Sequence, residues 1–210
     1  LQREHEMLLR AQTAAKDAQL QMLRYQLNPH FMFNTMNAIS TLIYKNENDT
    51  ANEMIDKLCE FFRYSLDKND KSKTSLQREL ELIELYLSIE KVRFANRLSV
   101  DVDVCETVLD CQVPSMLLQP LVENAIKYAI ELRKSGGKIR IIAKKVAERL
   151  IIKVADNGQE TPIKVRDGFG IGISNTKARL NAMFSGDYHV DITDAIDGGT
   201  TVSISIPYEK

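Results

Sequence analysis

A short charged segment without apolar residues divides this chain into two parts with different sequence patterns. The segment reads DKNDKSKTS over residues 67–75, which is the composition of a linker. Before it, apolar residues recur at helical spacing, whereas after it stretches with strand alternation appear between helical ones. We therefore expect an α+β chain, with an all-helical part up to residue 73 and a mixed part over residues 74–210.

The composition narrows the classes of function. The 210 residues are 44% hydrophobic, and 28 Lys and Arg stand against 29 Asp and Glu, so a core is expected but not a nucleic-acid or anionic membrane partner. The sequence begins at Leu1 within a helical pattern, so we expect a fragment whose upstream sensor or membrane domain is missing. Cys59, Cys105 and Cys111 show no metal-ligand spacing and are predicted to be packing residues in a reducing compartment.

Residues 1–27 carry the pattern of a coiled coil, and we predict a signalling helix in a parallel dimer. Leucines recur at coiled-coil spacing at Leu20, Leu23 and Leu27. Asn28-Pro29 then interrupts the pattern, because proline lacks a backbone N–H and disfavours helical geometry in the residue before it. We expect a kink there in a continuing helix, and we hypothesise that it biases how an incoming signal changes the exposure of His30.

Residues 28–73 are predicted to form a helical hairpin for dimerisation. Apolar residues continue at helical spacing as far as the polar turn KNENDT, residues 45–50, and a second amphipathic helix follows from about Ala51. A single hairpin is too thin to bury both apolar stripes, whereas two copies bury them in a four-helix bundle. The pattern therefore predicts a homodimer.

Residues 74–210 are predicted to form one catalytic domain of helices and strands. Thr74 and Gln77 are expected to form a capping box for a helix that runs to about Phe94. Further helices are expected at residues 117–132 and 173–183, and strands at residues 99–105, 138–145, 149–155, 190–193 and 201–206.

Two segments combine polar residues in a way that suits phosphate chemistry, although neither is specific alone. His30 lies in QLNPHFMFN, and a lone histidine beside an apolar helix is more often structural. The segment PLVENAIKYAI places Glu123, Asn124, Lys127 and Tyr128 within about one and a half helical turns. Asparagine offers a neutral oxygen to Mg²⁺ and lysine a point charge to phosphate, but an ordinary amphipathic helix explains this segment equally well by itself.

Two glycine-containing segments follow. Asp156-Asn157-Gly158 comes directly after a predicted strand, where glycine permits a tight turn beside a carboxylate. Gly168, Gly170 and Gly172 directly precede a helix, whose free amides and positive end favour phosphates. The glycine loop is neither a dinucleotide fingerprint nor a Walker loop, because neither a βαβ unit with a ribose-binding acid nor a GK[ST] sequence follows it.

In this order the motifs resemble the sensor histidine kinases of the LytS and YehU type. The resemblance covers about Leu20 to Pro207 and includes the H box, N box, DNG box, glycine box and the closing GGTTVSISIP. It implies that the hairpin is followed by a Bergerat-fold α/β-sandwich that binds ATP. It also implies a two-component kinase that phosphorylates His30 and then an aspartate of a response regulator, of the LytTR type, in the cytoplasmic portion of a larger bacterial sensor.

The resemblance assigns the phosphate side of the site to five residues. Asn124 would bind Mg²⁺ and Lys127 would meet the phosphates. The glycine box, with Gly168, Gly170 and Gly172, would line the phosphates.

It assigns the adenine side to four others. Asp156 would accept a hydrogen bond from the adenine amino group, Gly158 would line the base, and Thr200 would lie opposite Asp156. Tyr128 stands where this family often has histidine, and related kinases use tyrosine there to flank adenine.

The sequence departs from the pattern in two places. Gln159-Glu160 follows the DNG box where a second glycine is common, and the lid up to Gly168 is short, so ATP affinity or lid closure is expected to be unusual. Phe31 follows His30 where many histidine kinases carry an acid, which leaves the catalytic base open.

The sequence offers one candidate for that base and one for a role in dephosphorylation. Glu123 is a candidate base by its place in the N box, and Asn34, four residues after His30, is a candidate for orienting a water in dephosphorylation. Pro120 stands where gyrase-like relatives carry a water-activating glutamate, which argues against an efficient ATP hydrolase.

Two other classes of function stay open on the sequence. One is a nucleotide-binding pseudokinase or response-regulator phosphatase that signals by dimer conformation. The other is a protein-serine kinase on the same ATP-binding fold, which His30 in a dimerising hairpin disfavours.

Overall fold

The computed structural model describes residues 28–66, 73–158, 169–194 and 198–209. Its backbone divides into two compact units, Leu1–Asp56 and Lys57–Lys210. The predicted coiled coil with Leu20, Leu23 and Leu27 lies outside the described residues, as do Gln159, Glu160 and Gly168.

Helix α2 (Pro29–Tyr44) has Asn28 as its N-cap and a proline as its first residue. Asn28 is not helical, with φ −60° and ψ 103°, and its side chain accepts a hydrogen bond from the N–H of Phe31 at 3.2 Å. Pro29 occupies the first helical position, where its missing N–H has no helical partner to lose. The expected kink inside a continuing helix is wrong at this point, because Asn28 is not helical and caps the start of α2.

The predicted turn after α2 closes with a Schellman motif. Asn46 has a left-handed φ of 61°, and its N–H bonds to the carbonyl of Ile43 at 3.0 Å. The N–H of Glu47 reaches the carbonyl of Leu42 at 2.9 Å, so two of the last carbonyls of α2 are satisfied. Helix α3 (Asn48–Leu66) then starts slightly before the predicted position.

Helix α4 (Leu76–Phe94) follows strand β1 (Lys73–Ser75) and ends where the sequence predicts. Its cap is Ser75, whose hydroxyl accepts a hydrogen bond from the N–H of Arg78 at 3.3 Å. The capping box of Thr74 and Gln77 is wrong, because Thr74 is held in β1 by pairing with β3 (Gln112–Pro114) and the helix starts one residue too late for it.

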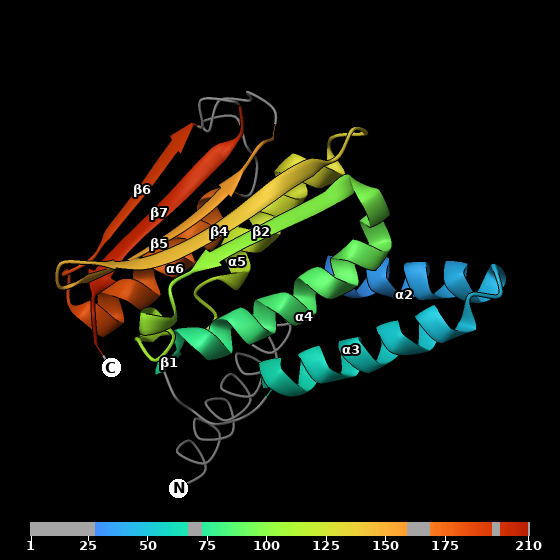
Figure 1. Ribbon diagram of the computed structural model, residues 1–210, viewed down its shortest axis with the longest axis horizontal. Coiled ribbons are helices and arrows are strands. Elements are labelled where there is room, and N and C mark those ends of the chain that lie inside the picture. Colours follow the sequence, from blue (N-terminus) through green and yellow to red (C-terminus); the bar gives the residue numbers. More distant parts are fainter. Residues whose placement is uncertain (1–27, 67–72, 159–168, 195–197, 210) are drawn as a thin grey trace, which may run out of the picture. The chain divides into compact units, whose positions relative to one another are not determined.

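The described part of the second unit also contains a five-stranded mixed sheet in the order β2-β4-β5-β7-β6 (Figure 1). Strands β2 and β4 are parallel, and every other neighbouring pair is antiparallel. The strands are β2 (Leu98–Val104), β4 (Gly137–Val146), β5 (Arg149–Asp156), β6 (His189–Asp194) and β7 (Thr200–Pro207). All five predicted strands are confirmed, with ends shifted by a residue or so.

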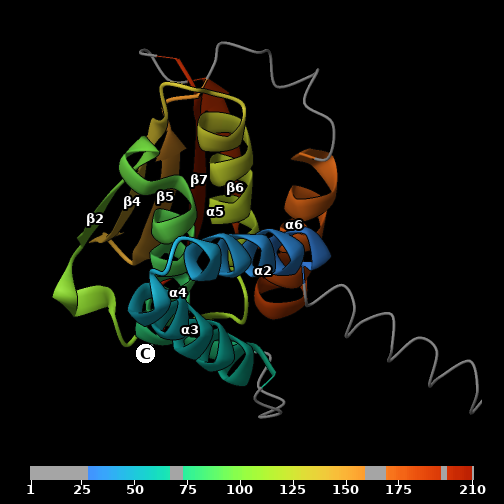
Figure 2. The same ribbon diagram turned by 90° about the vertical axis from the view of Figure 1, so that its right-hand side faces the viewer.

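Helices cover one face of this sheet (Figure 2). These are α5 (Gln119–Ala125), the π-helical segment η3 (Ile126–Glu131) that continues it, and α6 (Phe169–Phe184). Helix α4 packs against α5 and β2, and the 3-10 turns η1 (Ala95–Arg97) and η2 (Glu106–Val108) lie in the connections. The predicted helix over residues 117–132 is thus confirmed, but its second half has the wider π geometry.

The core of this unit lies between the helices and the sheet. Alternate residues of β4, β5 and β7 are buried, as the period of a strand with one covered face requires. The sheet contributes Ile139, Ile141, Leu150, Ile152, Val154, Val202, Ile204 and Ile206. Of the cysteines, only Cys111 is buried; the packing role predicted for Cys59 and Cys105 is wrong, because both are exposed.

Candidate functional site

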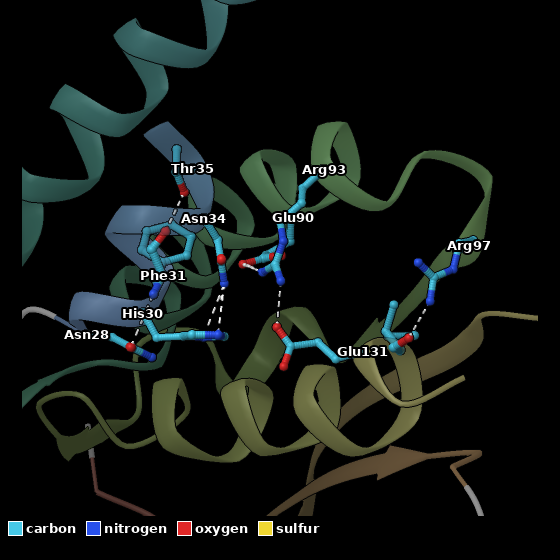
Figure 3. A network of polar contacts seen from close by, with 10 residues as sticks. Asn28, His30, Phe31, Asn34, Thr35, Glu90, Arg93, Arg97 and Glu131 are labelled. Atoms are coloured by element: carbon cyan, nitrogen blue, oxygen red, sulfur yellow. Dashed lines mark hydrogen bonds and ion pairs between the residues drawn. The ribbon is translucent and has the colours of Figure 1, made fainter. Parts of the chain in front are cut away.

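The side chains of His30 and Asn34 meet one turn apart on α2 (Figure 3). The Asn34 amide nitrogen lies 3.2 Å from Nδ1 and 3.1 Å from Nε2 of His30, and it can donate to whichever ring nitrogen is unprotonated. His30 itself is exposed. The imidazole is therefore open to an external reactant while a neighbouring amide orients it.

The start of α5 is held by a buried carboxylate from α4. Glu79 accepts hydrogen bonds from the N–H groups of Met116 at 2.6 Å and Leu118 at 3.1 Å. Burial raises the pKa of Glu79, and these backbone donors oppose the rise. From α6, Arg179 donates to the carbonyls of Met116 at 2.8 Å and Ser115 at 3.3 Å. Helices α4 and α6 thus fix the loop that aims the predicted N box.

Asn124 lies on α5 with its amide nitrogen buried and without a hydrogen-bond partner among the described residues. A Cβ placed on Gly172 of α6 would lie 3.5 Å from that nitrogen and 3.6 Å from Cβ of Pro120. A buried polar group without a partner calls for a ligand or a water. The two amide atoms differ only by a flip of the side chain, so the oxygen can occupy the same place and suits a hard cation such as Mg²⁺.

Glu123, the candidate base, is fixed by the residue one turn earlier on α5. The side-chain N–H of Gln119 donates to Oε1 of Glu123 at 2.8 Å, and Oε1 of Gln119 is buried without a partner among the described residues. Glu123 is only partly buried. Its carboxylate is therefore oriented without being sealed off from solvent.

Lys127 and Tyr128 lie in the π-helical segment η3. Lys127 is exposed, and its Nζ lies 5.1 Å from the centroid of the Tyr128 ring. Tyr128 is buried, and its carbonyl oxygen would lie 3.2 Å from a Cβ placed on Gly158. The backbone of Tyr128, the predicted adenine tyrosine, therefore lies next to the DNG turn.

The DNG turn gathers the predicted adenine residues. Oδ1 of the buried Asp156 accepts hydrogen bonds from the N–H groups of Gly158 at 2.8 Å and Thr200 at 3.3 Å. Gly199 has φ 92°, and a Cβ there would lie 2.1 Å from the Asp156 carbonyl oxygen, so only glycine permits this approach. Asp156, Gly158 and Thr200 therefore lie together in the fold.

The glycine box is described only in part. Gly170 lies in the first turn of α6 and Gly172 follows it in the same helix, facing Asn124 as given above, while Gly168 is outside the described residues. Within the described ranges, no group of three or more His, Cys, Asp or Glu is placed to hold a metal ion.

The sequence did not reveal the residues that support the site through hydrogen bonds. They are Glu79, Arg97, Gln119, Arg133 and Arg179, each bonded to the backbone or to a predicted site residue. One signal was available for Glu79: it lies three residues after Leu76 and four before Ile83, at a position where the helical pattern requires an apolar side chain. A carboxylate there predicts a buried partner.

Both parts of the chain match known families. Residues 18–98 match the family described as Histidine kinase, and residues 113–210 match the family described as Histidine kinase-, DNA gyrase B-, and HSP90-like ATPase. The chain is 36% identical over 206 residues to the sensor protein LytS of Staphylococcus saprophyticus, a match that covers 93% of the chain and 34% of that relative. It is 34% identical over 207 residues to the sensor histidine kinase/phosphatase LytS of Staphylococcus aureus, covering 93% and 35%. The chain thus spans about a third of the length of these curated relatives.

Solved structures share the fold. The histidine kinase domain of the Erythrobacter litoralis EL346 blue-light activated histidine kinase superposes with a TM-score of 0.52 at 16% identity, covering 91% of this chain and 94% of that one. The Acinetobacter baumannii histidine kinase AdeS gives 0.51 at 14% identity, covering 90% and 98%. The predicted α+β fold, with a Bergerat-type ATPase domain, is confirmed. Among the described helices, none is long and apolar enough to cross a membrane.

Proposed function

The chain belongs to the histidine kinase family, and from this premise we propose that it uses ATP to phosphorylate its own His30 and passes the phosphoryl group to an aspartate of a response regulator. The observation that carries the proposal is the buried, partnerless amide of Asn124 facing Gly172, in the same unit as the Asp156, Gly158 and Thr200 cluster. Because residues 113–210 match an ATPase family, the unpaired polar group in the N box supports the binding of a nucleotide.

On this proposal each end of ATP has its own group of residues. Asp156 and Thr200 lie at the adenine end, with the ring of Tyr128 beside the base. Lys127 and the amides at the start of α6, including Gly170, serve the phosphates. Asn124 would hold Mg²⁺ together with phosphate oxygens, and the ion would supply positive charge against the charge that develops on the phosphates.

The chemistry at His30 is an in-line displacement. A lone pair of the imidazole attacks the γ-phosphorus, a nitrogen–phosphorus bond forms, and the bond to the β,γ-bridging oxygen breaks with its electrons leaving on ADP. The remaining ring N–H loses its proton, and we assign that proton to the carboxylate of Glu123. An aspartate oxygen of the regulator later attacks the same phosphorus, and the imidazole leaves and takes up a proton.

Asn34 suits the dephosphorylation of a phosphorylated regulator. Its amide reaches the His30 ring nitrogens, so in the unphosphorylated protein it is placed to orient a water beside a regulator's phosphoaspartate.

Helix α2 carries exposed apolar residues, which support the proposed four-helix bundle between two copies. They are Phe33, Met36, Ile43 and Tyr44. We propose that residues 28–73 form this dimerisation part, that residues 74–210 form the catalytic part, and that both belong to the cytoplasmic portion of a larger sensor that serves a LytTR-type regulator.

Calorimetry with Mg-ATP tests the nucleotide site. We expect Asn124→Ala to weaken Mg-ATP binding at least tenfold, and Asp156→Ala to remove the preference for ATP over GTP. The exposed Asn181→Ala on α6 serves as the matched control and should bind as the wild type does. If both site variants bind Mg-ATP as tightly as the control, the assignment of this site is wrong.

A further inference from the structure

Arg93 in the last turn of α4 and Arg97 in the following turn η1 both reach the end of the π-helical segment η3 (Figure 3). Arg93 donates to Oε1 of Glu131 at 2.7 Å, on the last residue of η3. Arg97 donates to the carbonyl oxygens of Ile130 at 2.8 Å and Arg133 at 2.6 Å. The π-helical segment is thus held both by a side-chain ion pair and through its own backbone.

The contact of Arg97 adds to the backbone hydrogen bonds at the end of the π-helical segment. The carbonyl of Ile130 also accepts the N–H of Arg133 at 3.3 Å, and the carbonyl of Arg133 also accepts the N–H of Gly136 at 3.0 Å. A single nitrogen of Arg97, Nη2, donates to both carbonyl oxygens. Arg97 therefore ties η1 directly to the backbone where η3 ends.

The contact of Arg93 is electrostatic. Its guanidinium also binds both carboxylate oxygens of Glu90 at 3.3 and 3.1 Å, so one cation serves two carboxylates. The side chain of Glu90 is only 2% exposed. Burial, opposed by Arg93 and aided by Glu131, raises the pKa of Glu90 to about 7. Loss of Arg93 would remove the ion pair that ties Glu131 to α4, so the end of η3 would lose this support.

The end of η3 is in turn tied to the DNG turn. Arg133 donates to the carbonyl oxygen of Asn157, and Oδ1 of Asn157 accepts the N–H of Lys138 at 2.6 Å. A Cβ on Gly137 would lie 2.7 Å from the Ala129 carbonyl, so β4 and η3 approach closely here. A shift of the π turn would therefore change the spacing between Lys127 or Tyr128 and the Asp156 turn.

We propose that Arg93 and Arg97 are positioning residues for the nucleotide: by fixing the π-helical turn, they set the spacing of Lys127 and Tyr128 from the DNG turn and so determine ATP affinity. This inference rests on the proposed ATP-dependent function. Neither arginine touches the nucleotide in this account. Both act through the helix that does.

The test is a comparison of KM and kcat for autophosphorylation in the whole chain, with Tm measured alongside. Arg97→Met and Arg93→Met should each raise KM for ATP at least tenfold, with kcat at saturating ATP within about threefold of wild type. Arg149→Met is the matched control, because Arg149 also donates to a backbone carbonyl, that of Ser205 at 3.1 Å, but on strands away from η3. It should lower Tm without changing KM.

The possible results distinguish the positioning role of the two arginines from the proposed ATP-dependent function. If wild type neither binds ATP nor labels His30, the proposed function fails. If wild type does both while Arg97→Met and Arg93→Met keep the KM of the Arg149→Met control, the two arginines are merely structural and the inference is overturned. Should Arg93→Met fail to fold, Arg93→Lys, which keeps one charge but loses the fork, decides the matter by the same KM criterion.

Discussion

The side-chain amide of Asn34 lies 3.1 Å from Nε2 of His30, one helical turn along α2. This contact joins the proposed phosphoacceptor to a group that can also orient water. Removal of the amide should leave the imidazole exposed and nucleophilic. Asn34→Ala is therefore expected to keep autophosphorylation within about threefold while lowering phosphatase activity on a phosphorylated regulator at least tenfold.

Release of inorganic phosphate from the phosphoregulator is the measurement for Asn34. Asn37→Ala, at an exposed position on the same helix, is the control and should change neither rate. Equal phosphatase rates in the Asn34 and Asn37 variants would remove Asn34 from the reaction.

Gly172 allows the nucleotide site to be tested without disturbing the fold. A methyl group there would meet its nearest neighbour, the Asn124 amide, at an ordinary contact distance of 3.5 Å. Because alanine is also a better helix former by about 1 kcal/mol, Gly172→Ala should fold at least as stably as wild type. In the proposed site the methyl group would occupy space meant for the phosphates, so we expect ATP affinity to fall about tenfold. Unchanged affinity in calorimetry would show that no ligand uses that space.

Gly199 tests whether the DNG turn depends on close backbone packing. Its φ is 92°, and a Cβ would lie 2.6 Å from the Gly158 nitrogen, whereas Gly186, with φ 95°, has nothing within 4 Å. Gly186→Ala should cost only the backbone strain, about 1 kcal/mol. Gly199→Ala should cost about 3 kcal/mol or more, because the clash adds to the strain. Urea denaturation of the two variants measures the difference, and equal losses would contradict the packing seen here.

Some features of the fold and of the candidate site could be predicted from the sequence, and others could not. The strands followed from alternation, which is a local pattern, whereas the grouping of Asp156, Gly158 and Thr200 was implied only by the family resemblance. The Ser75 cap and the π-helical turn could not be predicted, because pairing of β1 with β3 and the contact of Arg97 involve residues far apart in the chain. Cys59 and Cys105 were misplaced for a related reason: composition alone does not tell which side of an element faces solvent.

The raised pKa of Glu90 predicts a specific pH dependence. Its folded pKa is about 7 against an ordinary value of 4.5, so between these values the folded state holds the proton more tightly than the unfolded state. This stabilisation is fully present below about pH 4.5 and is lost as pH rises through about 7, with a total of roughly 3 kcal/mol.

Glu90→Gln isolates that contribution, because glutamine keeps the shape but does not titrate. We expect wild type to lose stability relative to Glu90→Gln as pH rises from 5 to 8, as measured by urea denaturation at each pH. Parallel pH profiles for the two proteins would mean that Glu90 does not titrate in this range.

The central claim is that His30 accepts the γ-phosphoryl group of ATP. Incubation of the wild-type chain with γ-labelled Mg-ATP, beside His30→Gln, tests it most directly. Because the acceptor and the nucleotide residues lie in separate units of the chain, His30→Gln should retain ATP affinity. The account predicts a label on wild type that is labile to acid and stable to base, and no label on His30→Gln. Label of the same stability on His30→Gln, or no label on a wild-type chain that binds ATP, would contradict it.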